Sequence, residues 1–133
     1  MKPAYFALSL ALFAAAPAHA QGLTVGVGET WIFVLAKGQP AKARKVKPSA
    51  SAKRGEIKVS VRSMLGTTMT INGNVAMAYT YKASLVGAGG KPIPARSCTL
   101  PANNQLSFEH WPQQAQAVRL SDFKPAPDGG NCP

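Results

Sequence analysis

The sequence predicts an all-β fold, a small antiparallel β-sandwich of about seven to eight short strands. Apolar residues recur at every second position through much of the chain, which is the spacing of a strand with one buried face. Turn signals rich in Gly, Pro and Asn arrive about every ten to fifteen residues, as in sandwiches and barrels. No segment free of helix breakers carries apolar residues at helical spacing, and only residues 41–52 and 113–117 leave room for a short helix.

The first expected strands lie in the N-terminal half of the chain. Residues 23–27 alternate apolar with small side chains, and residues 30–36 (TWIFVLA) are apolar on both faces, which is typical of a central buried strand. Residues 57–62 show the clearest alternation of apolar and polar side chains. Trp31 is therefore expected in the core.

The middle of the chain carries a hairpin signal. Residues 67–71 (TTMTI) are rich in β-branched side chains, and the turn sequence Asn72-Gly73-Asn74 separates them from residues 78–86 (AYTYKASLV). Tyr79 and Tyr81 share one face of the second arm with smaller apolar residues. These two segments are expected to form a hairpin with both tyrosines turned inward.

The remaining strands are shorter and interrupted by proline. Pro92 and Pro94 confine their segment to a sheet edge or a loop, because proline lacks the N–H that a central strand donates. Residues 96–100, 106–111 and 117–123 complete the predicted set. In strand count the sandwich resembles immunoglobulin-like and fibronectin-type domains, although the Cys, Trp and Cys pattern of antibody domains is absent.

The N-terminus has the features of a cleaved secretory signal peptide, residues 1–20. Lys2 provides a positive start, residues 4–16 an apolar stretch too short to span a bilayer, and Ala18-His19-Ala20 a cleavage sequence. The mature chain, residues 21–133, is expected to be one domain with no transmembrane segment, located in the periplasm or outside the cell. Removing Lys2 leaves 14 basic and 5 acidic residues, a net charge of +9.

Both cysteines belong to the mature chain. An even number of cysteines in an exported protein predicts a bridge, here between Cys98 and Cys132, that closes a loop of about 33 residues. It would tie down the tail, residues 124–133, which is rich in Pro and Gly. A redox role is disfavoured because the two residues lack the CxxC spacing.

The scarcity of histidine argues against catalysis and against a metal or other cofactor. His110 is the only histidine of the predicted mature chain, too few for zinc or blue-copper sites, and its neighbour Glu109 points to the opposite face of a strand. Met64, Met69 and Met77 are soft ligands for copper, but methionines at such spacings are usually core residues. A small hydrolase built on His110 is the weaker alternative.

The most unusual part of the composition is a basic segment without any acidic residue. It is expected to form a loop over residues 37–55. A connection of this length is longer than a sandwich needs and is therefore either functional or mobile. We expect contact with an anionic partner, whereas the alternative is a solvated loop whose charge only aids solubility. The candidate binding residues, which continue onto the next strand, are Lys42, Arg44, Lys45, Lys47, Lys53, Arg54, Lys58 and Arg62.

The expected function is that of a non-enzymatic exported binding module whose partner is a membrane surface, a polysaccharide or an acidic protein. Sequence-specific nucleic-acid binding is disfavoured, because no aromatic residue lies between Lys37 and Arg62. Trp111, next to a proline at a strand end, is the aromatic residue expected to be partly exposed. The alternative is a structural or assembly accessory of the cell envelope that pairs an open sheet edge with a partner strand.

Overall fold

The structure is a computed structural model that describes residues 22–126. The predicted signal peptide and Cys132 lie outside the described residues, so the cleavage and the Cys98–Cys132 disulfide stay predictions. The described chain has no helix and forms two antiparallel sheets, which confirms the predicted β-sandwich. The strands are β1 (Leu23–Gly26), β2 (Thr30–Ala36), β3 (Gln39–Val46), β4 (Ile57–Ser63), β5 (Thr67–Gly73), β6 (Tyr79–Val86), β7 (Pro92–Ala95), β8 (Leu106–Trp111) and β9 (Ala117–Pro125).

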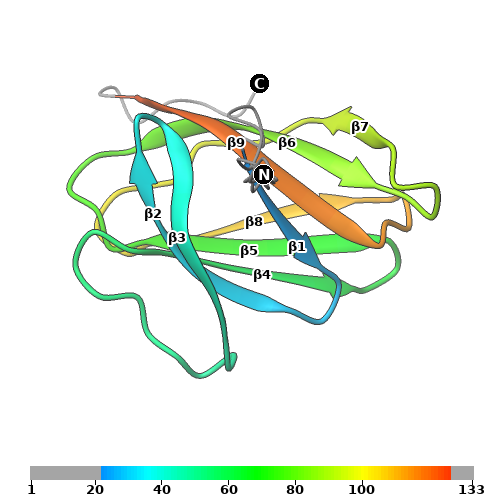
Figure 1. Ribbon diagram of the computed structural model, residues 1–133, viewed down its shortest axis with the longest axis horizontal. Coiled ribbons are helices and arrows are strands. Elements are labelled where there is room, and N and C mark those ends of the chain that lie inside the picture. Colours follow the sequence, from blue (N-terminus) through cyan, green and yellow to red (C-terminus); the bar gives the residue numbers. More distant parts are fainter. Residues whose placement is uncertain (1–21, 127–133) are drawn as a thin grey trace, which may run out of the picture.

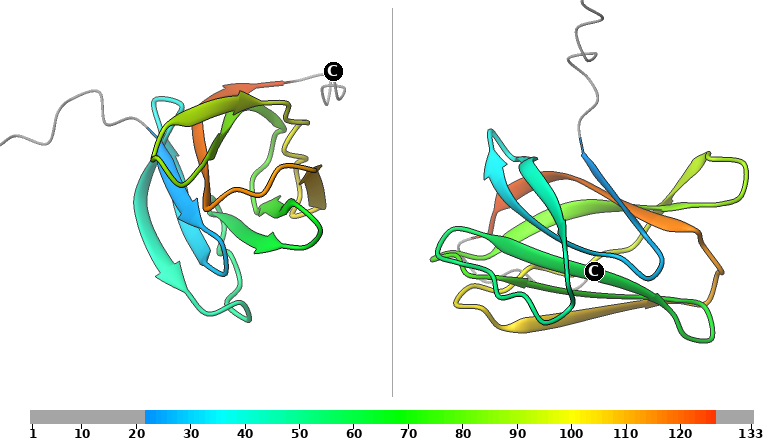
Figure 2. Two further views of the ribbon diagram at one scale, coloured as in Figure 1. Left: turned by 90° about the vertical axis from the view of Figure 1, so that its right-hand side faces the viewer. Right: turned by 60° about the horizontal axis from the view of Figure 1, so that its bottom comes forward.

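The two sheets form the two layers of the sandwich (Figures 1 and 2). One has four strands in the order β1-β9-β6-β7, and the other has five in the order β3-β2-β4-β5-β8. β1 and β2, although consecutive, belong to different sheets, and so do β5 and β6. Within the described residues, no helix is long and apolar enough to cross a membrane.

The segment expected as one long basic loop contains a strand. β3 pairs with β2 through a turn at Lys37 and Gly38, which have φ values of 51° and 77°. The sequence did not reveal β3 because it is an edge strand, and its side chains, which are half-buried or exposed, leave no alternation of apolar residues. The connection without regular structure is therefore residues 47–56, and the helix considered for residues 41–52 was wrong.

Two further expectations about the strands were wrong. β5 and β6 do not form a hairpin, because the amide and carbonyl of Asn74 bond to Glu56 and Gly55 beside β4 rather than closing a tight turn. Residues 96–100, which were expected to form a strand, do not form one; the strand in this region is β7, just before them. Residues 96–100 retain only an isolated bridge between Leu100 and Tyr79. β9 also extends to Pro125, so the expected tail starts later than residue 124.

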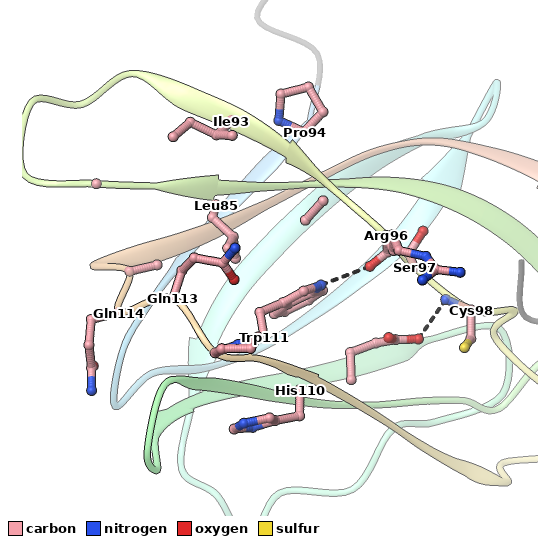
Figure 3. Close-up of a pocket in the computed structure, with 15 residues that line it drawn as sticks. Leu85, Ile93, Pro94, Arg96, Ser97, Cys98, His110, Trp111, Gln113 and Gln114 are labelled. Carbon is pink, nitrogen blue, oxygen red and sulfur yellow. Dashed lines mark hydrogen bonds between the residues drawn. The ribbon is translucent and has the colours of Figure 1, made fainter.

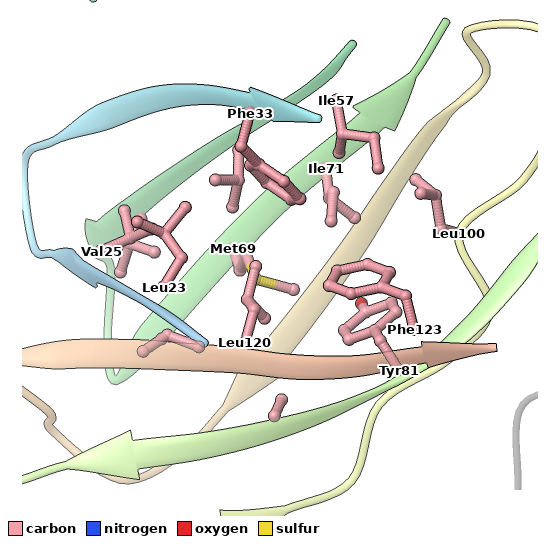
Figure 4. Close-up of a cluster of buried hydrophobic side chains, with 14 of the residues drawn as sticks. Leu23, Val25, Phe33, Ile57, Met69, Ile71, Tyr81, Leu100, Leu120 and Phe123 are labelled. Carbon is pink, nitrogen blue, oxygen red and sulfur yellow. The ribbon is translucent and has the colours of Figure 1, made fainter. Parts of the chain in front are cut away.

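The core lies between the two sheets (Figure 4). The predicted inward residues of β4 are fully buried, and Tyr81 is buried on β6 as expected. Phe33, Tyr81 and Phe123 form an aromatic group, with ring centroids 5.7 Å apart for Phe33 and Phe123 and 5.2 Å for Tyr81 and Phe123. This group joins β2 of one sheet to β6 and β9 of the other.

Some side chains differ from their expected burial. Met69 fills the core, but Met64 and Met77 are exposed at turns, so their assignment to the core was wrong. Trp111, expected to be partly exposed, is buried because its indole faces inward from β8 and donates to the Arg96 carbonyl. Trp31 is half-buried against the core.

We expect Leu120→Ala to lower the free energy of unfolding by about 2–5 kcal/mol, because it leaves a cavity in a fully buried position. Urea denaturation measures the change. Leu106→Ala, at a side chain that is 54% exposed, serves as the control and should change stability by less than about 0.5 kcal/mol. Equal losses in the two variants would contradict the assigned core.

Candidate functional site

The predicted basic residues gather along one edge and the outer face of the five-stranded sheet. Arg44 and Lys58 both pair in register with Ile32, whose neighbours Trp31 and Phe33 turn toward the core, so all three lie on the outer face. The other members lie on β3, on the connection 47–56 and further along β4. We call this set of eight residues, Lys42, Arg44, Lys45, Lys47, Lys53, Arg54, Lys58 and Arg62, the basic surface.

Part of this charge is offset within the protein. Arg44 forms an ion pair with Glu56 at 2.8 Å, and Lys45 forms one with Glu29 at 2.9 Å. The Lys58 ammonium donates a hydrogen bond to the Pro48 carbonyl at 2.5 Å. The other five members form no ion pair among residues 22–126, although the charge of Lys53 helps to lower the pKa of Glu56. They are Lys42, Lys47, Lys53, Arg54 and Arg62.

Hydrogen bonds hold the connection 47–56 in place. The Asn74 side chain donates to the Ala52 carbonyl at 3.1 Å, and the Gly55 N–H donates to the Asn74 carbonyl at 2.7 Å. The Glu56 carboxylate accepts from the Lys53 N–H at 2.8 Å as well as from Arg44, and these bonds lower its pKa, Arg44 contributing most. The Ala52 side chain is buried. The backbone that carries Lys47, Lys53 and Arg54 is therefore fixed.

Glu29 joins the basic edge to the rest of the fold. One of its carboxylate oxygens accepts from the Gly26 N–H at 2.7 Å and from the Trp31 indole at 3.1 Å, and the other pairs with Lys45. The bond from Lys45, followed by those from Trp31 and Gly26, lowers the pKa of Glu29 to about 2. This carboxylate connects β1, β2 and β3.

A second concave surface, which the sequence did not predict, lies between the edges of the two sheets. This β7–β8 groove has a volume of about 640 Å³ and is lined by Leu85, Gly87, residues 93–98 and residues 109–115 (Figure 3). Leu85, Ile93 and Ala95 come from the four-stranded sheet, and Trp111 comes from the five-stranded sheet. The groove is thus a mainly apolar gap between β7 and β8.

An acid lies in the wall of the groove. Glu109 is only 8% exposed and accepts a hydrogen bond from the Cys98 N–H at 2.5 Å, and burial raises the pKa of its carboxyl. The nearby Tyr81 hydroxyl is buried without a hydrogen-bond partner among the described residues. Burial, and secondarily the charge of Glu109, raise the pKa of Tyr81.

The structure does not bring the weaker catalytic candidates together. His110 and Glu109 both line the groove, but the His110 ring lies on the outer face of β8, where its Nδ1 is 2.9 Å from the Thr68 hydroxyl, whereas the Glu109 side chain lies on the inner face. A catalytic set built on His110 would also need an acid such as Asp122, but Asp122 accepts a hydrogen bond from Gln39 of β3, at the opposite edge of the five-stranded sheet from β8. Within the described range, no group of three or more His, Cys, Asp or Glu residues has the geometry of a metal site.

No family model matches the sequence, and no match was found among curated proteins or solved structures. The function therefore has to be inferred from the chemistry of the two surfaces.

We expect Glu29→Gln to destabilise the protein at pH 7, by up to about 1 kcal/mol since the pair with Lys45 is partly exposed. Because the folded-state pKa of Glu29 is lowered to about 2, its carboxylate stabilises the fold fully above the ordinary pKa of 4.5, and this contribution disappears as the pH falls toward 2. Urea denaturation at pH 7 and pH 3 tests this. A difference between wild type and variant that does not shrink at pH 3 would contradict the role of the charge.

Unlike Glu29→Gln, the variant Glu109→Gln is expected to stabilise the protein at pH 7. Burial raises the pKa of Glu109 in the folded state, so its ionisation opposes folding as the pH rises through and above the ordinary pKa of 4.5. Gln keeps an oxygen to accept from the Cys98 N–H without the charge, so the variant should melt at a higher temperature than wild type at pH 7. Thermal melts at pH 7 and pH 4 provide the test, and the gain should be smaller at pH 4.

Proposed function

We propose that this protein is a non-enzymatic binding module, exported to the periplasm, that contacts an anionic partner through the basic surface. The observation that carries the proposal is the fixed connection 47–56, in which Lys47, Lys53 and Arg54 form no ion pair with any described residue. A surface whose backbone is already ordered loses little conformational entropy on binding. The partner is a membrane surface, a polysaccharide or an acidic protein.

Protection of a sheet edge explains only part of the charge. Lysine and arginine on an edge strand discourage pairing with other chains, and Lys42, Arg44 and Lys45 lie on the edge strand β3. The cations of the connection 47–56 do not lie on an edge strand, and neither does Arg62, because β4 is in the middle of its sheet. Edge protection does not explain them. Their placement therefore favours an external partner.

The charge pattern also indicates the kind of recognition. The cations are spread over a strand, a connection and a sheet face, and none of them adjoins an aromatic side chain in sequence. Such a surface attracts polyanions by long-range electrostatics, with an affinity that falls as salt screens the charges. It suits a repeating anionic surface better than a small ligand in a shaped pocket.

The triple variant Lys47→Gln, Lys53→Gln and Arg54→Gln tests the proposal. Cosedimentation with phosphatidylglycerol vesicles and retention on an acidic polysaccharide column measure binding at low salt and at 0.5 M salt. Because each cation near an anionic surface contributes about 1 kcal/mol, removing three of them should lower the vesicle affinity by roughly 150-fold. Wild-type binding should be lost at 0.5 M salt.

The matched control removes the same charge elsewhere, with Lys82→Gln, Lys91→Gln and Lys124→Gln. This control should retain wild-type affinity within about threefold, the residual effect of net charge on a surface. Equal losses in the two triple variants would show that only net charge matters and would overturn the assigned surface. Absence of binding to both anionic probes, or binding that survives 0.5 M salt, would overturn the electrostatic proposal.

A further inference from the structure

A second interaction site follows from how the sheets end. Each of the two sheets has two edges, formed by β1 and β7 in one and by β3 and β8 in the other. An edge strand presents unpaired N–H and C=O groups to any extended chain, so proteins usually protect it. Three of these four edges are short, basic or interrupted by proline, whereas the fourth, β8, carries one inward-facing charge, Glu109.

The protected edges differ in how they avoid pairing. β1 has only four residues. β3 is basic, and its register with β2 shifts between Ile32 and Val34. In β7, Pro92 and Pro94 pair with Val86 and Ser84, and neither proline has an N–H to donate on either side. These edges are poor templates for another strand.

β8 has none of these features. It is six residues long, contains neither proline nor lysine, and pairs in an uninterrupted register with β5 on one side only. Every second residue therefore turns its N–H and C=O away from β5, where no strand lies within residues 22–126. On the outer face, Leu106 and Phe108 are 54% and 63% exposed. β8 is an open edge beside apolar surface.

The β7–β8 groove lies along this open edge. Leu85, Ile93 and Trp111 point toward the space between the two sheets (Figure 3). A chain that paired with β8 would place every second side chain on the inner side of the sheet, at the groove. Its volume of about 640 Å³ is in the range of ligand pockets.

We propose that β8 binds an extended segment of a partner protein by strand addition, with apolar side chains of that segment filling the β7–β8 groove. Backbone hydrogen bonds to β8 supply affinity, and the groove selects the alternate side chains. This site is separate from the basic surface, which lies at the opposite edge of the same sheet and on the adjoining outer face.

The chemistry of the groove favours a partner segment over a second copy of this chain. In a second copy, the inward residues Glu109 and Trp111 of β8 are already buried in their own sandwich, so pairing of two β8 strands would leave both grooves unfilled. The Glu109 carboxyl, which accepts from the Cys98 N–H and lines the groove, also offers an acceptor to a donor on the occupant. The expected occupant is therefore apolar at alternate positions, with a hydroxyl or amide side chain facing Glu109.

A synthetic peptide tests the proposal on the full chain. The probe is a fluorescein-labelled ten-residue peptide with serine at the even positions and valine at the odd positions, except for threonine at position 5, so that one face is apolar with a single hydroxyl. Fluorescence anisotropy measures its binding. We expect saturable binding that persists in 0.5 M salt, because the probe is uncharged in its binding segment. Salt resistance also separates this site from the proposed anionic contact, so that either proposal can fail alone.

N-methylation of the peptide distinguishes strand addition from simple apolar contact. One probe is methylated at its odd residues and a second at its even residues, so that each loses the N–H groups of one edge. Strand addition to β8 uses only one edge, and one of the two probes should therefore bind at least tenfold more weakly than the other. Equal affinities for the two methylated probes would overturn the proposal.

Variants locate the binding site. Ile93→Glu places a charge at the groove, at a side chain that is 62% exposed and whose replacement should leave the fold intact, and it should weaken binding of the unmethylated probe at least tenfold. Met77→Glu, at an exposed methionine outside the groove lining, is the matched control and should bind like wild type. Thermal melts confirm that both variants fold. Equal affinities in the two variants, or dimers in sedimentation that exclude the probe, would overturn the proposal.

Discussion

Sheet edges are the constraint on which the rest of this structure depends. A sandwich of two open sheets has four edge strands, and each exposes backbone groups that can pair with another chain. The most basic strand, β3, and the strand with two prolines, β7, are both edges. The two most unusual compositional features of the chain are thus found where protection from unwanted pairing is needed. β8, which lacks both features, lies beside the β7–β8 groove.

The sequence predicted those parts of the fold in which the burial of one strand face produces an alternating pattern of apolar residues. Residues 57–62 alternate because one face of β4 packs into the core, and their role could be inferred without any partner strand. β3 gave no such signal, because an edge strand with exposed side chains forms through its backbone bonds to β2. The supposed hairpin at Asn72-Gly73-Asn74 failed for a different reason. A turn sequence reports a local bend, but Asn74 bonds to Gly55 and Glu56, and the chain passes to the other sheet.

The same distinction applies to the functional surfaces. Composition identified the eight basic residues, but it could not show that Arg44 and Lys45 are paired with Glu56 and Glu29, which lie far from them in sequence. The β7–β8 groove could not be predicted, since it forms only where Ile93 and Trp111 of different sheets approach each other. One signal was available in residues 106–111, where Leu106 and Phe108 alternate with inward residues. Apolar side chains on both faces of a short strand indicate either a covered face or a binding edge.

Glu109 shows why the groove is better understood as a binding site than as a packing defect. A carboxyl in this position opposes folding when ionised, because burial raises its pKa and the Cys98 N–H satisfies only part of its hydrogen-bonding capacity. The adjacent Tyr81 hydroxyl is also buried without a partner among the described residues. An apolar residue at position 109 would fill the space without this cost. A polar group in an otherwise apolar groove instead gives the site a means to select an occupant that supplies a hydrogen-bond donor.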